Sequence, residues 1–444
     1  MQLPTKQHTR RAFLAAGLAP AGGLGLAACG AQPGPAPAAA PAGPPVELSW
    51  WMSEDPVASG MQEVADAYNA AQPAIKVTIT PQTSGYEDKL RAALAAGTPP
   101  EVARLNDDLI ASYVCRGSCR PLEDYLTRAR VKKDEFFSAQ WRLPTVEGKT
   151  YAIVVGYTPQ VVWVNAEHFQ RAGLKVPTVP YKSDEWTWAD FLDAARKMTA
   201  PPGPDGISPV YGASALQSWY GYWVWGNGGE VLTPDKKRFG LALPSGYEAL
   251  QWAADLINKH KVHPPMAYIR QPGLGALDLF AAGRLGMLAG GGNWATLRQR
   301  AAALNWDIVP YPKGKVRRGH TSTPLLFMVP TGTRHPDQAF TYLMHLVSDD
   351  AQKIVGAKGF RMPPKKAQAN SSLFLRPDLP PKNQRLWLDA QEGALEEPQI
   401  PQREKLRQTY RPALEPVWAG TQTAQEAMKA VEAQCNAVLA EPCA

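Results

Sequence analysis

The chain has 444 residues and a formal net charge of +7, a length that suggests about two or three domains. Its basic residues form no long runs, and the short cluster at 313–318 is more typical of a solvated loop than of a nucleic-acid-binding stripe. After the N-terminal region no segment approaches ~18 uninterrupted apolar residues. We therefore expect no nucleic-acid partner and no membrane-spanning helix in the mature chain.

The first 28 residues have the pattern of an export signal. Residues 9–14 (TRRAFL) match a twin-arginine signal, and the apolar stretch from Ala12 to Ala28 is too short and too rich in glycine to favour a spanning helix. It ends in LAAC (26–29), which looks like a bacterial lipobox, where the cysteine thiol takes a diacylglycerol. We expect residues 1–28 to be a twin-arginine lipoprotein signal peptide and Cys29 to be lipidated. A plain signal peptide with a chance cysteine is the alternative.

Residues 29–45 are expected to form a tether. The stretch GAQPGPAPAAAPAGPP (30–45) has no charge and no β-branched residue, so it favours extended polyproline geometry and spans up to about 50 Å at ~3.1 Å per residue. A tether behind a lipid anchor holds a domain close to a membrane without burying it. The expected location is the outer face of the cell membrane, or the periplasm.

Besides Cys29, the chain contains Cys115, Cys119, Cys435 and Cys443. An even number outside the cytoplasm predicts disulfides in one of three connectivities, of which the local pairs 115–119 and 435–443 are the simplest. A metal site is the rival interpretation, but these spacings without a nearby histidine fit zinc poorly. We expect the two local disulfides, no metal and no cofactor.

Strand-like and helix-like segments alternate after the tether. Strands are predicted at 46–52, 75–80 and 101–108, and helices at 57–73 and 86–96, where apolar residues recur at helical spacing. A β-α-β-α-β order builds a parallel sheet with helices on both faces, so the predicted fold class is α/β. Such sheets bind ligands beyond the carboxyl ends of their strands.

The residues that follow the three strands are polar or aromatic, as the rim of a binding site should be. They include Ser53 and Glu54 after the first strand, Tyr86 after the second, and NDD (106–108) after the third. Helix capping is the alternative role, because serine and aspartate suit both tasks.

Aromatic residues also gather beside glycine. Most of the 14 tryptophans and 15 tyrosines are expected in the core. However, Trp50-Trp51 precedes polar residues, and WYGYWVW (219–225) precedes Gly-Asn-Gly-Gly. A core strand does not usually place so many rings next to so much glycine, which favours a binding role for some of them.

Several stretches occur in an order that is similar to one protein family. They include GKTYAIVVGYTPQVVWVNAEHFQRAGLKVP (148–177), FAAGRLGMLAGGGNW (280–294) and HPDQAFTYLMHLVSDDAQKIVGAKGFRMPP (335–364). From about residue 46 to 364 the chain resembles the extracellular solute-binding proteins of carbohydrate ABC transporters, the relatives of maltose- and glycerol-3-phosphate-binding proteins.

The resemblance implies a type II periplasmic-binding-protein-like fold. In this fold two α/β lobes are joined by crossing strands, and the ligand is clamped between them. The implied N-terminal lobe comprises 46–155 and 290–320, and the implied C-terminal lobe comprises 156–289 and 321–444.

The resemblance also implies crossings near 154–159, 287–291 and 320–324. The second contains the start of a triple glycine, which we interpret as a crossing that brings Trp294 to the cleft, because glycine allows unusual backbone angles and close approach. A phosphate loop would need a Gly-Lys-Ser/Thr ending, and GLGALD (273–278) lacks the third glycine of a dinucleotide-binding motif.

Sugars present hydroxyls, which need paired donors and acceptors, and apolar ring faces, which stack on aromatic rings. The resemblance gives Trp294 the stacking role. Leu105 stands where maltose binders have a stacking tryptophan, which argues against maltodextrin, and Thr158 stands where they have a ligand-contacting acid. Arg361 matches a ligand contact of glycerol-phosphate-type binders, with a surface salt bridge as the alternative. The candidate ligand-binding residues are Trp51, Ser53, Glu54, Tyr86, Asn106, Asp107, Asp108, Tyr157, Trp219, Tyr220, Trp223, Asn227, Gly292, Asn293, Trp294 and Arg361.

The expected function is a lipid-anchored, monomeric receptor, not an enzyme. It would capture an oligosaccharide or a sugar- or glycerol-phosphate-like solute and deliver it to the transmembrane subunits of an ABC importer. The alternative is a secreted, lipid-anchored glycan-active hydrolase, which needs two carboxylates ~5–9 Å apart. Asp107 and Asp108 are adjacent on a predicted strand and point different ways, and Glu396-Glu397 is predicted to be solvated. A surface adhesion protein is a third class, in which a two-lobed fold has no purpose.

We predict that Cys29→Ala releases the protein from the membrane or leaves its signal peptide uncleaved, because the change removes the thiol that would take the lipid. Cell fractionation and mass spectrometry of the N-terminus measure this. A matured Cys29→Ala protein that stays membrane-bound like the wild type would refute the lipobox.

Overall fold

The structure is a computed structural model that describes residues 43–201, 209–290 and 294–443. Pro41–Ala444 group into one compact unit, which contains all the described helices and strands. The predicted signal peptide, Cys29 and most of the tether lie outside the described residues. Within the described part, no helix is long and apolar enough to cross a membrane.

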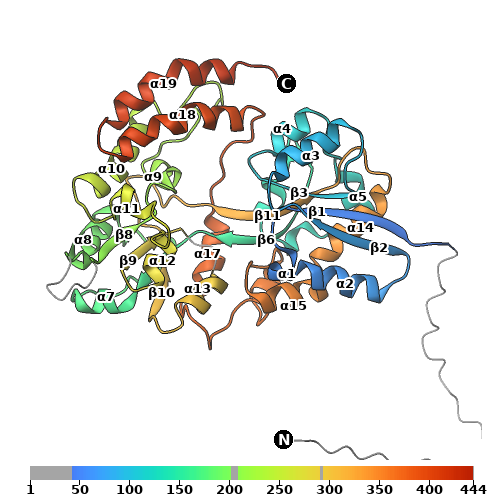
Figure 1. The fold of residues 1–444 in the computed structure, drawn as a ribbon, viewed down its shortest axis with the longest axis horizontal. Coiled ribbons are helices and arrows are strands. Elements are labelled where there is room, and N and C mark those ends of the chain that lie inside the picture. Colours follow the sequence, from blue (N-terminus) through green and yellow to red (C-terminus); the bar gives the residue numbers. More distant parts are fainter. Residues whose placement is uncertain (1–42, 202–208, 291–293, 444) are drawn as a thin grey trace, which may run out of the picture. The chain divides into compact units, whose positions relative to one another are not determined.

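Two β-sheets divide this unit into a first and a second lobe (Figure 1). The first sheet contains β1 (Val46–Met52), β2 (Ile75–Pro81), β3 (Val102–Leu105), β6 (Ile153–Pro159) and β11 (Ser322–Met328). The second sheet contains β7 (Val162–Asn165), β8 (Tyr211–Ser214), β9 (Leu285–Ala289) and β10 (Trp306–Val309). The first has the order β2-β1-β3-β11-β6, with β1 parallel to β2 and β3, and β11 antiparallel to β3 and β6. The second has the order β10-β7-β9-β8, with β8 parallel to β9 and the other neighbours antiparallel.

Helices cover both sheets. The first lobe contains α1 (Pro56–Ser59), α2 (Met61–Ala71), α3 (Tyr86–Ala95), α4 (Ile110–Cys115), α5 (Glu123–Arg128), the 3-10 helix η1 (Lys133–Glu135), α6 (Ala139–Arg142), the hairpin of β4 (Thr145–Val146) and β5 (Lys149–Thr150), α14 (Pro336–Leu346), α15 (Asp349–Lys358) and α16 (Lys366–Ala369). The second lobe contains α7 (Ala166–Arg171), α8 (Trp188–Met198), α9 (Tyr220–Gly226), α10 (Pro244–Asn258), α11 (Met266–Ile269), α12 (Ala276–Ala281), α13 (Trp294–Arg300), α18 (Arg403–Trp418) and α19 (Ala424–Leu439). Helix α17 (Leu386–Gly393) packs against β6.

The predicted β-α-β-α-β order is confirmed at the start of the first lobe. Strand β1 alternates, with Leu48, Trp50 and Met52 turned into the core. The predicted helix at 57–73 is divided into α1 and α2 because Gly60 takes a left-handed backbone conformation with a φ of 80°. The first sheet is mixed rather than wholly parallel, because β6 and β11 run antiparallel to each other.

The described chain passes between the lobes three times. The first crossing follows Pro159 of β6, and the second precedes Ser322 of β11, in agreement with the crossings expected near 154–159 and 320–324. Ser322 pairs with Pro159, so these two crossings lie side by side. The third crossing leads from α16 through α17 to α18.

The expected division of the chain between the lobes is wrong for 290–320 and for the start of 321–444, and no crossing occurs near 287–291. Strands β9 and β10 both pair with β7 in the second lobe, whereas β11 pairs within the first sheet. The physical reason is that β7 has two edges to fill. Strand β10 completes one of them and buries Trp306 and Ile308 before the chain leaves this lobe.

Trp294 is a core residue, so the expectation that it forms a stacking wall of the cleft is wrong. Its side chain is 1% exposed, and its ring centroid lies 5.7 Å from that of Phe374 and 4.7 Å from that of Trp387. Because the chain does not cross at the glycine run, α13 carries Trp294 into a hydrophobic cluster instead. Gly292 and Asn293 lie outside the described residues.

The cysteines pair differently from the two local disulfides that we expected. Cys115 is bonded to Cys443, with their Cα atoms 6.1 Å apart, while Cys119 and Cys435 are buried free thiols. Cys115 ends α4 and is partly exposed, whereas Cys119 turns into the core against Met328. Cys435 likewise lies on the buried face of α19, and Cys443 lies beyond the end of that helix. Neither local pair therefore forms.

We predict that Trp294→Ala lowers the free energy of unfolding of the ligand-free protein by about 3–5 kcal/mol, the usual cost of truncating a buried tryptophan. Trp294→Phe keeps a ring beside Trp387 and should cost clearly less. Urea denaturation followed by circular dichroism measures both. A loss below about 1 kcal/mol for Trp294→Ala would contradict a core role.

Candidate functional site

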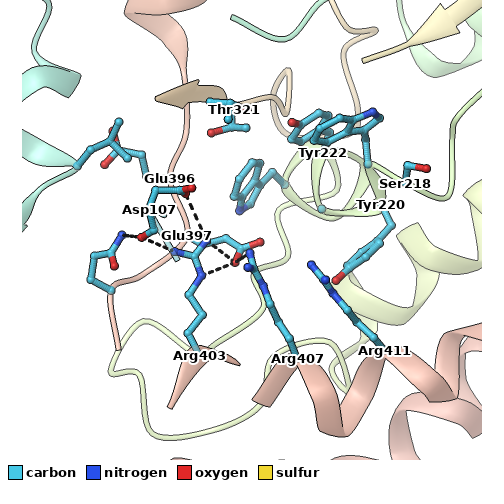
Figure 2. A pocket seen from close by; sticks show the side chains of 16 residues that line it. Asp107, Ser218, Tyr220, Tyr222, Thr321, Glu396, Glu397, Arg403, Arg407 and Arg411 are labelled. Carbon is cyan, nitrogen blue, oxygen red and sulfur yellow. Dashed lines mark hydrogen bonds and ion pairs between the residues drawn. The ribbon is translucent and has the colours of Figure 1, made fainter. Parts of the chain in front are cut away.

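A cavity of about 260 Å³ lies between the two lobes (Figure 2). Its walls come from the first lobe, the crossing segments, α9 with the two residues before it, and one face of α18. The lining residues are Asp107, Leu143, Ser218, Trp219, Tyr220, Gly221, Tyr222, Trp225, Thr321, Thr323, Glu396, Glu397, Gln399, Arg403, Arg407 and Arg411. In Figure 2, Tyr222 and Thr321 lie across the cavity from Arg403.

Three stacked rings form an aromatic wall along α9. The ring of Trp219 is nearly parallel to that of Tyr222, with centroids 5.3 Å apart and planes 10° apart. Tyr222 and Trp225 are stacked in the same way, at 5.8 Å and 20°. A spacing of three residues places these side chains on one face of the helix. We call Trp219, Tyr222 and Trp225 the aromatic wall, against which apolar C–H groups can pack.

The aromatic wall also carries an unused polar group. Tyr222 is 5% exposed, and its hydroxyl has no hydrogen-bond partner among the described residues. Burial raises the pKa of Tyr222 well above its ordinary value, so the hydroxyl stays protonated. A buried polar group without a partner costs about 1–3 kcal/mol. A ligand hydroxyl bound there would offset that cost.

Gly290 makes room for the aromatic wall. Its φ is +105°, and a Cβ atom added to it would lie 2.2 Å from the indole Nε1 of Trp219. Only glycine allows the backbone to approach the indole this closely. The start of the glycine run therefore supports a cavity residue rather than a crossing between the lobes.

The opposite side of the cavity is charged. We call Glu397 and the α18 residues Arg403, Arg407 and Arg411 the charged wall. Glu397 pairs with Arg403 at 2.9 Å and with Arg407 at 2.8 Å, and its side chain is 19% exposed. Burial acts to raise the pKa of Glu397, but the two guanidinium groups outweigh it, so this pKa lies below its ordinary value. Arg403, Arg407 and Arg411 recur every four residues, which places them on one helix face.

The first lobe meets this charged wall. Asp108 pairs with Arg407, and the backbone oxygen of Asp107 accepts a hydrogen bond from Gln399 Nε2 at 3.0 Å. The carboxylate of Asp107 lies 3.9 Å from Arg403. Burial raises the pKa of Asp107, and the positive charge of Arg403 offsets this only in part.

The prediction that Glu396-Glu397 is solvated is wrong. Glu396 pairs with Arg142 at 2.7 Å, and its side chain is 15% exposed. Burial raises its pKa, although Arg142 acts in the opposite direction. Both acids are enclosed because the segment that joins α17 to α18 runs along the cavity, where Leu395 N–H donates to the carbonyl of His320 at 2.9 Å.

The cavity brings together three residues that the sequence predicts for the site, namely Asp107, Trp219 and Tyr220. Trp223 and Asn227 belong to the second lobe but do not line it. Trp223 is buried and donates to the carbonyl of Leu216, and Asn227 donates to the carbonyl of Ser245. Successive helix residues are rotated by about 100°, so Trp223 does not share the face of its neighbour Tyr222 and packs on Trp252 instead, with ring centroids 5.0 Å apart.

The other described candidates also lie outside the lining of this cavity. Glu54 pairs with Arg361 at 2.7 Å, and Arg361 also donates to Thr158 at 3.2 Å, so Arg361 forms a salt bridge, but a largely buried one rather than the surface pair expected as the alternative. The hydroxyl of Tyr86 donates to the carbonyl of Arg104 at 2.7 Å. The candidates that do not line the cavity are Trp51, Ser53, Glu54, Tyr86, Asn106, Asp108, Tyr157, Trp223, Asn227, Trp294 and Arg361.

The charged wall is absent from the predicted ligand-binding residues, and so are Tyr222 and Trp225 of the aromatic wall. The three-residue spacing of Trp219, Tyr222 and Trp225 is a helical signal that would have identified them as one face. The charged wall lies beyond residue 364, where the family resemblance ends. Its signal is the four-residue spacing of arginines in REKLRQTYR (403–411).

Comparisons with known proteins agree with this fold. The family model described as bacterial extracellular solute-binding protein matches residues 53–353. An uncharacterised lipoprotein of Streptomyces antibioticus is 23% identical over 335 residues, which cover 72% of this chain and 70% of the relative. An ABC substrate-binding protein of Listeria monocytogenes in complex with cycloalternan has a TM-score of 0.76 and 21% identity, covering 89% of this chain and 99% of that chain. A maltose-bound T. maritima protein has a TM-score of 0.73 and 18% identity, covering 88% of this chain and 100% of that chain.

We predict that Glu397→Gln lowers the free energy of unfolding at pH 7 by on the order of 3 kcal/mol, because it leaves two guanidinium groups without their shared counter-charge. Since folding lowers the pKa of Glu397, its contribution is present above the ordinary carboxyl pKa and is lost as the pH falls through the folded value. The difference between wild type and variant should shrink below about pH 5. Denaturation curves at a series of pH values measure it.

Glu404→Gln is the matched control on the same helix. Glu404 pairs with Arg91 at 3.3 Å, but its side chain is 45% exposed, so the same change should cost less than about 1 kcal/mol. Equal losses for the two variants would contradict a special role of Glu397.

Proposed function

Because this chain belongs to the bacterial extracellular solute-binding proteins, we propose that it binds a sugar between its lobes and delivers it to an ABC importer. The observation that carries the proposal is a single interlobe cavity that combines the aromatic wall with the charged wall. The apolar C–H faces of a sugar ring pack on aromatic rings, and its hydroxyls pair with carboxylates and guanidinium groups.

Two structures with the same fold support a carbohydrate ligand. The Listeria protein is in complex with cycloalternan, and the T. maritima protein is bound to maltose. In this chain Glu397, Glu396 and Asp108 already have arginine partners. Such a wall offers hydrogen bonds with little uncompensated charge, which favours a neutral sugar over a sugar phosphate.

The proposed location is outside the cytoplasm, with a lipid anchor at Cys29. The LAAC motif and the tether at 29–45 support this, and the Streptomyces relative is named a lipoprotein. The proposed partner is the set of transmembrane subunits of an ABC importer, to which a monomeric receptor presents the closed lobes.

A glycan-active hydrolase is the second candidate function, and one observation favours it. The carboxyl groups of Asp107 and Glu396 line the same cavity, and burial raises the pKa of both, as a general acid requires. Family membership and the ion pair of Glu396 with Arg142 favour the receptor instead. Release of shorter sugars from an oligosaccharide, abolished by Glu396→Gln, would establish the hydrolase.

We predict that Trp219→Ala weakens sugar binding about 5- to 150-fold, since packing a sugar face on a large ring contributes ~1–3 kcal/mol. Mass spectrometry of small molecules that copurify with the protein, followed by calorimetry, identifies the sugar. Calorimetry with maltose, cycloalternan and a sugar phosphate then ranks these ligand classes by their dissociation constants.

Trp51→Ala is the matched control, because Trp51 is a half-buried tryptophan that does not line the cavity. The Trp51→Ala variant should bind the sugar with the same affinity as the wild type. Full affinity in Trp219→Ala, with a loss confined to Trp51→Ala, would move the site to the rim of the first sheet.

A further inference from the structure

The disulfide between Cys115 and Cys443 joins the two lobes. Cys115 ends α4 of the first lobe, and Cys443 follows α19, whose buried face belongs to the core of the second lobe. The two cysteines are 328 residues apart in the sequence. The lobes are thus linked by a covalent bond in addition to the three chain crossings.

This bond and the crossings lie on different sides of the cavity. Thr321 and Thr323, at the start of β11, line the cavity beside the crossings, whereas the arginines of α18 line the charged wall. In Figure 1 the crossing strands β6 and β11 run on one side of α18, and α19, whose end leads to Cys443, lies on the other side. The cavity is therefore bounded by the crossings at one end and by the disulfide toward the other.

The segment that leads to Cys443 is short and anchored. Gln402 Nε2 donates to the backbone oxygen of Glu441 at 2.6 Å, and Lys405 Nζ pairs with the carboxylate of Glu441 at 2.5 Å. Only Pro442 separates this anchor from Cys443. At ~3.3–3.6 Å per residue, the free length of chain is on the order of 7 Å. The disulfide adds the 6.1 Å between its two Cα atoms, so while the bond and the anchor hold, the end of α4 stays within on the order of 13 Å of the anchored Glu441.

Ion pairs connect α18 with the first lobe. Arg407 pairs with Asp108, and Glu404 pairs with Arg91 at 3.3 Å. Water can solvate such groups when the lobes separate, so these contacts are reversible. The disulfide is covalent, so water cannot separate Cys115 from Cys443 when the lobes move apart.

We propose that the Cys115–Cys443 disulfide is a strap that limits how far the two lobes open. The strap permits small rotations about the crossings and excludes wide-open conformations. A narrower set of open conformations lowers the entropy of the unliganded protein, which favours the closed, ligand-binding form. The limit on lobe opening follows from the disulfide alone. The effect of that limit on ligand affinity rests on the proposed function.

The two remaining thiols do not compete for this pairing. Cys119 is buried against Met328, and Cys435 is buried on α19. Burial raises the pKa of both thiols, that of Cys435 to about 11. Both therefore stay protonated near neutral pH and are poor nucleophiles for disulfide exchange.

Cys443→Ser tests the strap with little disturbance, because Cys443 is exposed near the chain end. Fluorophores on unnatural amino acids at the exposed Lys76 and Lys237 report the lobe separation of unliganded protein by single-molecule energy transfer. We expect a narrow distance distribution in the wild type and a broader one, extended to longer distances, in Cys443→Ser. Cys115→Ser should match it, whereas Cys435→Ser is the control that leaves the distribution unchanged. Melting curves verify that each variant is folded.

Identical distributions in the wild type and both strap variants would overturn the proposal, as would peptide mapping that finds Cys115 bonded to Cys119. With cycloalternan as the probe in calorimetry, we expect binding about three- to tenfold weaker in Cys443→Ser. A broader distribution with unchanged cycloalternan affinity would overturn the effect on binding. A broader distribution in a protein that binds no sugar in any form would support the strap and reject the proposed function.

Discussion

The antiparallel pairing of β6 with β11 is the constraint on which the two-lobed arrangement depends. Ser322 lies opposite Pro159 and Phe327 opposite Ile153, so two of the crossings leave the first sheet as neighbours. Every residue of β6 is buried, and its backbone polar groups need partners inside the protein. This ladder supplies them. The position of the second sheet, and with it the cavity, follows from where these two strands end.

The two sides of the interlobe contact differ in chemistry. Near the crossings, Trp294, Phe374 and Trp387 form part of a hydrophobic cluster that includes residues of both sheets. Along α18, by contrast, the first lobe meets arginines through carboxylates such as Asp108. Apolar burial is lost when surfaces separate, whereas charged groups regain water. The ionic contact along α18 therefore costs less free energy to separate than the apolar contact near the crossings.

The cavity keeps groups that lower the stability of the empty protein. The hydroxyl of Tyr222 has no partner in the described part of the chain, and the carboxyl of Asp107 has a raised pKa because burial disfavours its charged form. A core would replace such groups with apolar ones or satisfy them fully. Their presence beside a glycine-supported indole is typical of a site that is completed by its ligand.

Local chemistry was enough to predict the α/β class, the strands at 46–52 and 75–80, and the buried face of α2, because alternation and helical spacing act between near neighbours. It also identified Asp107, Trp219 and Tyr220 as candidates for the site. Which lobe receives β10 and β11, which cysteine pairs with Cys115 and why Trp294 is buried were predicted wrongly. Each of these depends on contacts between segments that are distant in the sequence, up to the 328 residues that separate the disulfide partners. Local spacing carries no information about such contacts, because they form only when both lobes have folded around the paired crossings.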